Sequence, residues 1–111
     1  MMDTFKIKKF DLVPALAVTL QYANGSSIDL TGGSVWFNMA HISTYAPLIS
    51  GICVITGSTT GMVEYRWQGL TDTGSVGKWW GEFELQNLTV GSRMTLPNDH
   101  TLKIEVYQDY N

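Results

Sequence analysis

The chain has 111 residues, of which 44% are hydrophobic and only 15% are charged, and its formal net charge at pH 7 is −3. This length predicts a single domain over residues 1–111, and the hydrophobic content excludes a disordered chain. The seven Lys and Arg residues form no basic stripe, which argues against a surface that binds nucleic acid. The low charge indicates either a surface that a partner covers or simply a small, uncharged domain.

The sequence shows no sign of secretion, membrane insertion or disulfide bonding. The N-terminal sequence has no apolar signal core, and no stretch approaches the roughly 20 apolar residues of a membrane span. The single cysteine, Cys53, excludes an intramolecular disulfide, and its apolar neighbours predict a buried, inert thiol. We therefore expect a protein made in a reducing cytoplasm that does not contact a membrane.

The first part of the chain shows strand signals separated by turns. Residues 15–22 alternate between polar and apolar and meet Asn24-Gly25, the dipeptide typical of a type I′ hairpin turn. A short strand is expected over residues 27–30. A Gly-Gly break then precedes a strand over residues 34–40.

The strand over residues 34–40 has two different faces, because side chains alternate along a strand. The face expected to point inward is apolar and holds Val35, Phe37 and Met39. The face expected to point outward holds Trp36, Asn38 and Ala40. A large aromatic side chain is therefore expected at the surface.

The middle of the chain contains a predicted loop, a buried strand, a turn and an alternating strand. Residues 41–50 contain Pro47 and no clean period, which predicts a loop. Residues 51–56 form a short apolar run typical of a buried strand, and residues 57–61 have the composition of a turn. Residues 62–67 alternate again and predict a strand.

The last third of the chain begins with a predicted turn over residues 71–77 and a strand over residues 78–86. A hairpin through residues 90–92 is expected to return along residues 93–96. Pro97-Asn98-Asp99 is a turn signal before a last strand over residues 101–106.

Short strands with a turn about every eight to twelve residues predict a sandwich or a barrel. No segment combines a helical period with helix caps. We predict an all-β, immunoglobulin-like β-sandwich of about seven to nine short antiparallel strands, with no significant helix. The side chains expected in its core are Phe37, Val63, Tyr65, Phe83, Leu102 and Ile104.

The two adjacent tryptophans cannot share one face of the strand over residues 78–86. Because Phe83 and Leu85 mark its inward face, Trp79 is expected to point inward and Trp80 outward, together with Glu82 and Glu84. In an immunoglobulin-like order this strand lies beside the strand over residues 34–40. Trp36 and Trp80 are therefore expected on one exposed face, as neighbours across the sheet.

Residues capable of catalysis or metal binding form no recognisable motif. His41 and His100 lie far apart in the sequence, and no zinc-ligand spacing occurs. Glu82 and Glu84 share a strand face, which is more typical of a solvated face than of a glycosidase pair. The turn aspartates, which usually bind local backbone, are Asp72, Asp99 and Asp109. We expect no enzymatic activity, and hence no catalytic residue, metal site or cofactor.

Several segments in a fixed order resemble one known family. They are Val13-Pro14-Ala15-Leu16, Ile28-Asp29-Leu30-Thr31-Gly32, Val35-Trp36-Phe37-Asn38-Met39, Met62-Val63-Glu64-Tyr65-Arg66-Trp67 and Leu96-Pro97-Asn98-Asp99. Over roughly residues 5–107 the chain resembles the N-terminal immunoglobulin-like domain of baseplate upper proteins. These proteins belong to tailed phages of Gram-positive bacteria and to related prophages.

The resemblance implies a structural module that anchors a protein to the tail tip or baseplate, while a separate downstream region holds the receptor-binding protein. It implies no catalytic residues. The chain departs from the pattern at Trp79-Trp80, where the family more often has a tyrosine followed by a polar residue. It also ends at Asn111 without a coiled coil or adhesin module, so we expect an excised domain or a stand-alone accessory tail protein.

The resulting hypothesis is a non-enzymatic phage tail or baseplate component, located in the virion and assembled in the host bacterial cytoplasm. Its expected partners are other tail or baseplate proteins, and a homo-oligomer in multiples of three is considered. The alternative is a carbohydrate-binding module that contacts host cell-wall glycan through exposed aromatic side chains. The expected interaction surface consists of Trp36, Trp80, Tyr45, Asn38 and Glu82.

Overall fold

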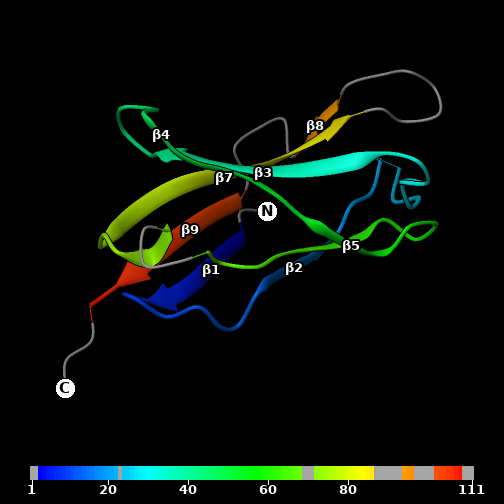
Figure 1. The fold of residues 1–111 in the computed structure, drawn as a ribbon. Coiled ribbons are helices and arrows are strands. Elements are labelled where there is room, and N and C mark those ends of the chain that lie inside the picture. Colours follow the sequence, from blue (N-terminus) through cyan, green and yellow to red (C-terminus); the bar gives the residue numbers. More distant parts are fainter. Residues whose placement is uncertain (1–2, 23, 69–71, 87–93, 97–101, 109–111) are drawn as a thin grey trace.

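The computed structural model describes residues 3–22, 24–68, 72–86, 94–96 and 102–108. These residues form two β-sheets that pack face to face as a sandwich (Figure 1). Their strands are β1 (Asp3–Lys8), β2 (Leu16–Thr19), β3 (Ser34–His41), β4 (Pro47–Ile52), β5 (Val54–Gly57), β6 (Met62–Tyr65), β7 (Gly77–Gln86), β8 (Met94–Leu96) and β9 (Leu102–Tyr107).

The larger sheet has the order β1-β9-β7-β3-β4, with β8 also paired to β7, and the smaller sheet has the order β2-β6-β5. The described residues thus form an all-β sandwich of two sheets, in which every strand pair except β1–β9 is antiparallel. The predicted fold class is therefore confirmed.

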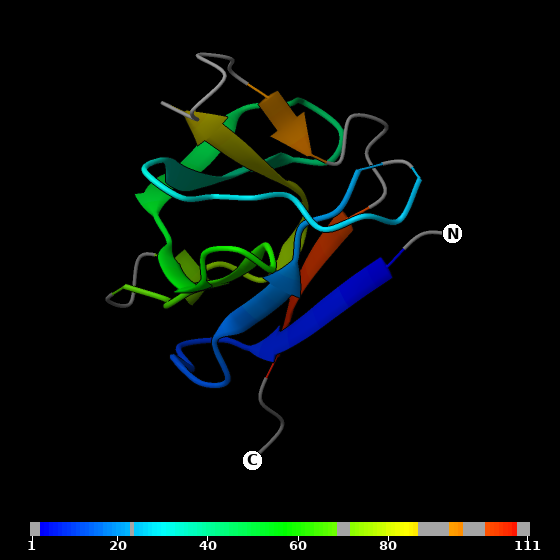
Figure 2. The ribbon, with the colours of Figure 1, turned by 90° about the vertical axis from the view of Figure 1, so that its right-hand side faces the viewer.

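One strand and its direction were not expected. β1 is absent from the elements predicted from the sequence, and it runs parallel to β9 rather than antiparallel (Figures 1 and 2). Ile7 of β1 is buried, and Phe5 packs partly against the core. β1 cannot be predicted from local turn signals, because its partner β9 lies at the far end of the chain.

The core lies between the two sheets and is rich in aromatic rings. Phe37 of β3 is central, with its ring centroid 4.9 Å from that of Tyr65, 5.2 Å from that of Phe83 and 6.1 Å from that of Trp67. Five of the six predicted core residues are confirmed as buried, namely Phe37, Val63, Tyr65, Phe83 and Ile104, whereas Leu102 packs against them only partly buried.

The predicted phases of β3 and β7 are also confirmed. Along β3, Val35, Phe37 and Met39 are buried, and along β7 the buried residues alternate from Trp79 to Leu85. The two strands are antiparallel, with Phe37 opposite Phe83. Trp79 is only 5% exposed, whereas Trp80 lies on the other face and is half-buried.

The predictions for residues 41–56 are wrong in two respects. The expected loop contains β4, which pairs with β3, and the expected single buried strand is the end of β4 followed by β5 of the other sheet. The chain crosses between the sheets at Cys53. Pro47 and the bulge opposite Met39/Ala40 interrupt the alternation of side chains along β4, so the sequence pattern did not predict a strand there. Ile52 is 52% exposed because β4 is an edge strand.

Cys53 itself is buried, as predicted. Burial raises the pKa of its thiol to about 12, since the apolar surroundings disfavour the charged thiolate. The thiol is therefore protonated and unreactive at neutral pH.

The predictions for residues 15–30 are correct in placing a turn at Asn24-Gly25 but wrong for its type and for the second strand. A type I′ turn needs positive φ at both central residues, and among the described non-glycine residues only Phe10 and Tyr45 have one. Gly25 has φ +87° and its N–H donates to the Tyr22 carbonyl, which places a turn at the Asn-Gly dipeptide. Instead of a strand, residues 27–30 contribute one isolated bridge between Gln21 and Ser27. Ile28 is nevertheless buried.

Two further predictions concern the ends of β7. Before it, Asp72 is buried and accepts hydrogen bonds from the Gln68 backbone N–H and the Tyr65 hydroxyl, both at 2.7 Å. It therefore binds local backbone, as expected of a turn aspartate. After it, β8 pairs antiparallel with β7, while the predicted hairpin turn at 90–92 and the turn at 97–99 lie outside the described residues. Asp99, His100 and Asp109 also lie outside them.

Candidate functional site

The outer face of β4, β3 and β7 carries the residues predicted for interaction. Because strand pairing fixes which side chains face one another, the register arranges this surface in rows. The rows, each running from β4 through β3 to β7, are Ile52–Trp36–Glu84, Ser50–Asn38–Glu82 and Pro47–Ala40–Trp80. We call the set of three rows the outer face.

Trp36 and Trp80 lie on this same face, as predicted, but they are not opposite each other. Trp36 is opposite Glu84, and Trp80 is opposite Ala40. The offset is four residues, which corresponds to about 13 Å along the strands at a rise of about 3.3 Å per residue. The expectation that the two indoles are neighbours across the sheet is therefore wrong in register.

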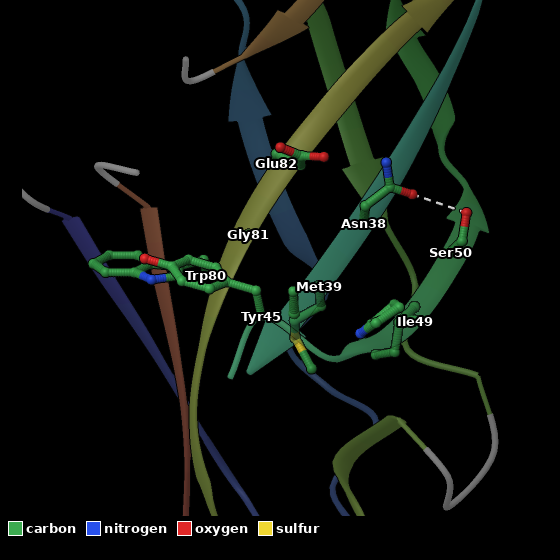
Figure 3. A pocket seen from close by; sticks show the side chains of 10 residues that line it. Asn38, Met39, Tyr45, Ile49, Ser50, Trp80, Gly81 and Glu82 are labelled. Atoms are coloured by element: carbon green, nitrogen blue, oxygen red, sulfur yellow. Dashed lines mark hydrogen bonds between the residues drawn. The ribbon is translucent and has the colours of Figure 1, made fainter. Parts of the chain in front are cut away.

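Trp80 instead belongs to a depression in the outer face, with a volume of about 320 Å³ (Figure 3). Four of the five residues predicted for interaction line it, namely Asn38, Tyr45, Trp80 and Glu82. Trp36, the fifth, does not contribute to its lining. The structure therefore divides the predicted surface into a depression and a separate tryptophan.

The turn between β3 and β4 brings Tyr45 to the depression. The Tyr45 N–H donates to the His41 carbonyl at 2.8 Å, and Tyr45 has the left-handed φ of +58°. His41 caps the turn, since the Ser43 N–H donates to its Nδ1 at 3.2 Å. Its ring also meets that of Trp79 edge-on. This contact and the capping bond give His41 a structural role in the turn.

The two sides of the depression differ chemically. Tyr45 and Trp80 lie at one side, and Asn38 and Ser50 lie at the other (Figure 3). The Ser50 hydroxyl donates to Asn38 Oδ1 at 2.8 Å, which fixes the amide. The small side chain of Ala40 between these groups leaves the space open. The arrangement places aromatic surface beside groups that can donate and accept hydrogen bonds.

A cation also contacts the aromatic side. Lys103 of β9 is opposite Trp80 in the sheet, and its ammonium nitrogen lies 5.6 Å from the indole centroid. This distance is within the range of a cation–π interaction. The contact holds the lysine stem beside Trp80 and adds a positive charge near the depression.

A second feature of the surface, the edge of β4, was missed from the sequence. Within the described residues β4 pairs only with β3, so its other edge is open. Leu48 and Ile52 are exposed by 42% and 52%, and Val54, just beyond the crossing, by 39%. The sequence gives no clear signal for it, because buried Ile49 and exposed Ile52 are the same residue type on opposite faces of the strand.

The described part of the chain holds neither a metal-binding cluster nor a membrane-spanning helix. It contains no group of three or more His, Cys, Asp or Glu side chains that could hold a metal ion. None of the helical segments in the described residues is long and apolar enough to cross a membrane.

Comparison of the chain with protein-family models, curated proteins and solved structures found no significant match. The resemblance to the phage baseplate domain therefore stays a prediction from the sequence.

Proposed function

We propose that the chain is a non-enzymatic structural module of a phage tail or baseplate that binds other tail proteins near the host-adsorption apparatus. The order of motifs that resembles baseplate upper proteins supports the phage setting. The β-sandwich agrees with the immunoglobulin-like domain that this resemblance implies. A role in protein–protein contact has its own support in the surface of the domain.

The observation that carries the proposal is the uncharged apolar surface at the edge of the larger sheet. Ile52 is half exposed and lies directly beside Trp36, and β4 contains no charged residue. Protein interfaces typically have an apolar, charge-poor centre with aromatic residues and a polar rim. Trp36 and Ile52 fit that centre, and Ser50 and Glu84 fit the rim.

The partners proposed are other tail or baseplate proteins, together with further copies of the chain in multiples of three. No nucleic acid or membrane is included, because the chain lacks a basic stripe and an apolar span. The proposed location is the virion, with assembly in the cytoplasm of the host bacterium.

Labelling intact virions tests this proposal. Gold-labelled antibodies against the chain should decorate the tail tip of purified particles of the phage that encodes it. The capsid of the same particles serves as the internal control. A chain that is abundant in infected cells but absent from purified virions would refute the structural role.

The alternative function is binding of host cell-wall glycan, and the depression is the specific observation in its favour. Its volume of about 320 Å³ lies at the lower end of typical ligand sites. Tyr45 and Trp80 could stack on the apolar face of a sugar ring, while Asn38, Ser50 and Glu82 supply hydrogen-bonding groups.

Tryptophan fluorescence during titration with purified cell-wall polysaccharide tests the alternative. Binding at the depression should change the emission of the wild type, and Trp80→Ala should abolish most of that change. An unchanged spectrum at millimolar sugar would remove the glycan hypothesis and leave the assembly proposal standing.

A further inference from the structure

We propose that the open edge of β4 pairs antiparallel with β4 of a second copy, around a two-fold axis at Gly51. The pair would join the two larger sheets into one continuous sheet. The idea deepens the assembly role proposed above by naming one partner, a second copy of the chain. It needs no other phage protein and can fail while the virion location holds.

The hydrogen-bonding pattern between β4 and β3 leaves backbone N–H and C=O groups of β4 available at its open edge for another strand. The Cys53 N–H donates to the Val35 carbonyl at 2.8 Å, and Gly51 is opposite Phe37 in the same ladder. In an antiparallel ladder the residues that bond to the partner alternate with residues that do not. Ser50 and Ile52 therefore direct their N–H and C=O groups away from β3, toward the open edge.

Pairing around Gly51 places the outward N–H and C=O groups of one β4 opposite the same set of groups on β4 of the second copy. Ser50 of one copy would be opposite Ile52 of the other, and the two such pairs would exchange roughly four backbone hydrogen bonds. The axis itself would pass between two glycines. No side chain is present there, because a Cβ at Gly51 would lie 2.7 Å from Tyr65 Cε1 on the inner face.

The outer face gains an apolar cluster in the same arrangement. Ile52 lies beside Trp36 within each copy, and the two Ile52 side chains would be diagonal neighbours across the axis. The row of Trp36 and Ile52 would continue into Ser50 and Asn38 of the second copy, and Ile52 and Trp36 of that copy would lie diagonally beside it. In this arrangement Trp36, which lies outside the depression, contributes to the contact between the two copies.

Charge favours a second copy at this edge and disfavours one at the opposite edge. Edge strands are commonly protected from pairing by charged residues, proline or bulges. The other edge strand, β1, carries Lys6 and Lys8, which would repel the same lysines of another copy. β4 carries no charge, and Pro47 and the bulge protect only its beginning.

The geometry also limits the assembly to a closed pair. A two-fold interface uses the same patch on both copies and cannot propagate into a fibre. The pairing is short, because β4 is bounded by the bulge on one side and by the crossing at Cys53 on the other. A ring of six built from three such pairs would need a second, different contact, so the proposed multiple of three does not depend on this edge.

Site-directed cross-linking tests both the pairing and its register. Residues in a hydrogen-bonded antiparallel pair have Cα atoms about 5.5 Å apart, within the range of a disulfide. A mixture of Ser50→Cys and Ile52→Cys chains should therefore form a disulfide-linked dimer under mild oxidation. Neither variant alone should form one efficiently, and Met62→Cys on the opposite face of the sandwich should stay monomeric. Native Cys53 is buried and stays reduced.

Sedimentation of the unlinked chain supplies the second readout. The wild type should show a concentration-dependent dimer, and Ile52→Lys should raise its dissociation constant by about tenfold or more. Met62→Lys changes the charge equally at a side chain that is 46% exposed on the other sheet, and it should leave the dimer unchanged. A wild type that remains monomeric at all concentrations, or a mixed disulfide no more abundant than with Met62→Cys, would overturn the pairing.

Discussion

The hydroxyl of Tyr65 donates a 2.7 Å hydrogen bond to the buried carboxylate of Asp72. This bond ties the central strand of the smaller sheet to the segment that leads into β7 of the larger sheet. Asp72 also accepts a bond from the Gln68 N–H, so the carboxylate holds both ends of the connection. Burial, together with the bond to Asp72, raises the pKa of Tyr65 above its ordinary value.

Removal of the Tyr65 hydroxyl should therefore destabilise the fold measurably. Tyr65→Phe keeps the ring in the core but leaves a buried carboxylate with one donor fewer, at a cost of about 1.5–3 kcal/mol. Urea unfolding followed by fluorescence measures this difference. Tyr22→Phe, at an exposed tyrosine, is the matched control and should change the free energy of unfolding little. Equal effects of the two changes would show that the bond to Asp72 contributes nothing.

Replacement by alanine should lower the stability of the fold at Trp79 and weaken binding at Trp80. Trp79→Ala removes a buried ring and should cost about 3–5 kcal/mol of stability. Trp80→Ala removes a half-buried ring at the depression, so it should leave the fold intact and weaken association with a partner or ligand. Thermal unfolding and a binding assay measure the two effects. A Trp80→Ala chain that fails to fold would contradict the assignment of Trp80 to the binding surface.

Phe83→Ala should also be costly, because Phe83 lies in the aromatic core against Phe37. The expected loss is about 3–5 kcal/mol, from the lost apolar burial and the cavity left behind. Chemical denaturation measures it, and a loss below about 1 kcal/mol would mean that the strand phase is incorrect.

The thiol of Cys53 should be nearly inert in the folded protein. Its folded pKa of about 12 exceeds the ordinary value of 9.0, so the folded state favours the protonated thiol. This contribution to stability is fully present below pH about 9 and is lost as the pH rises toward 12. A thiol reagent at pH 8 should react slowly with the native chain and rapidly in denaturant. Equally fast reaction in both states would contradict the burial of Cys53.

Local patterns were sufficient to predict the strands whose two faces differ. In β3 and β7 the alternation of Val35, Phe37 and Met39, and of Trp79 and Phe83, predicted both the strand and its phase. The reason is that both strands are central, with one face in the core and one outside. The division of the two tryptophans between core and surface followed directly from that phase.

Local patterns were insufficient where pairing is long-range or irregular. β1 pairs with β9, which is distant in the sequence, so no turn between neighbouring strands indicates that contact. β4 begins at a proline and carries a bulge, so its period is interrupted. Ile28 and Leu30 alternate like a strand, but their backbone N–H groups donate to Leu20 and Ser58 outside any ladder. The sequence likewise placed four residues of the depression in one predicted surface without indicating that Trp36 lies apart.

A density map of the tail tip of the intact virion would show whether the chain is a structural part of the tail. We expect a β-sandwich of this size in the map, with the outer face of β4, β3 and β7 covered by protein and Trp36 and Ile52 at the contact. A map in which this sandwich is absent from the tail, or present with that face fully open to solvent, would rule out the proposed structural role.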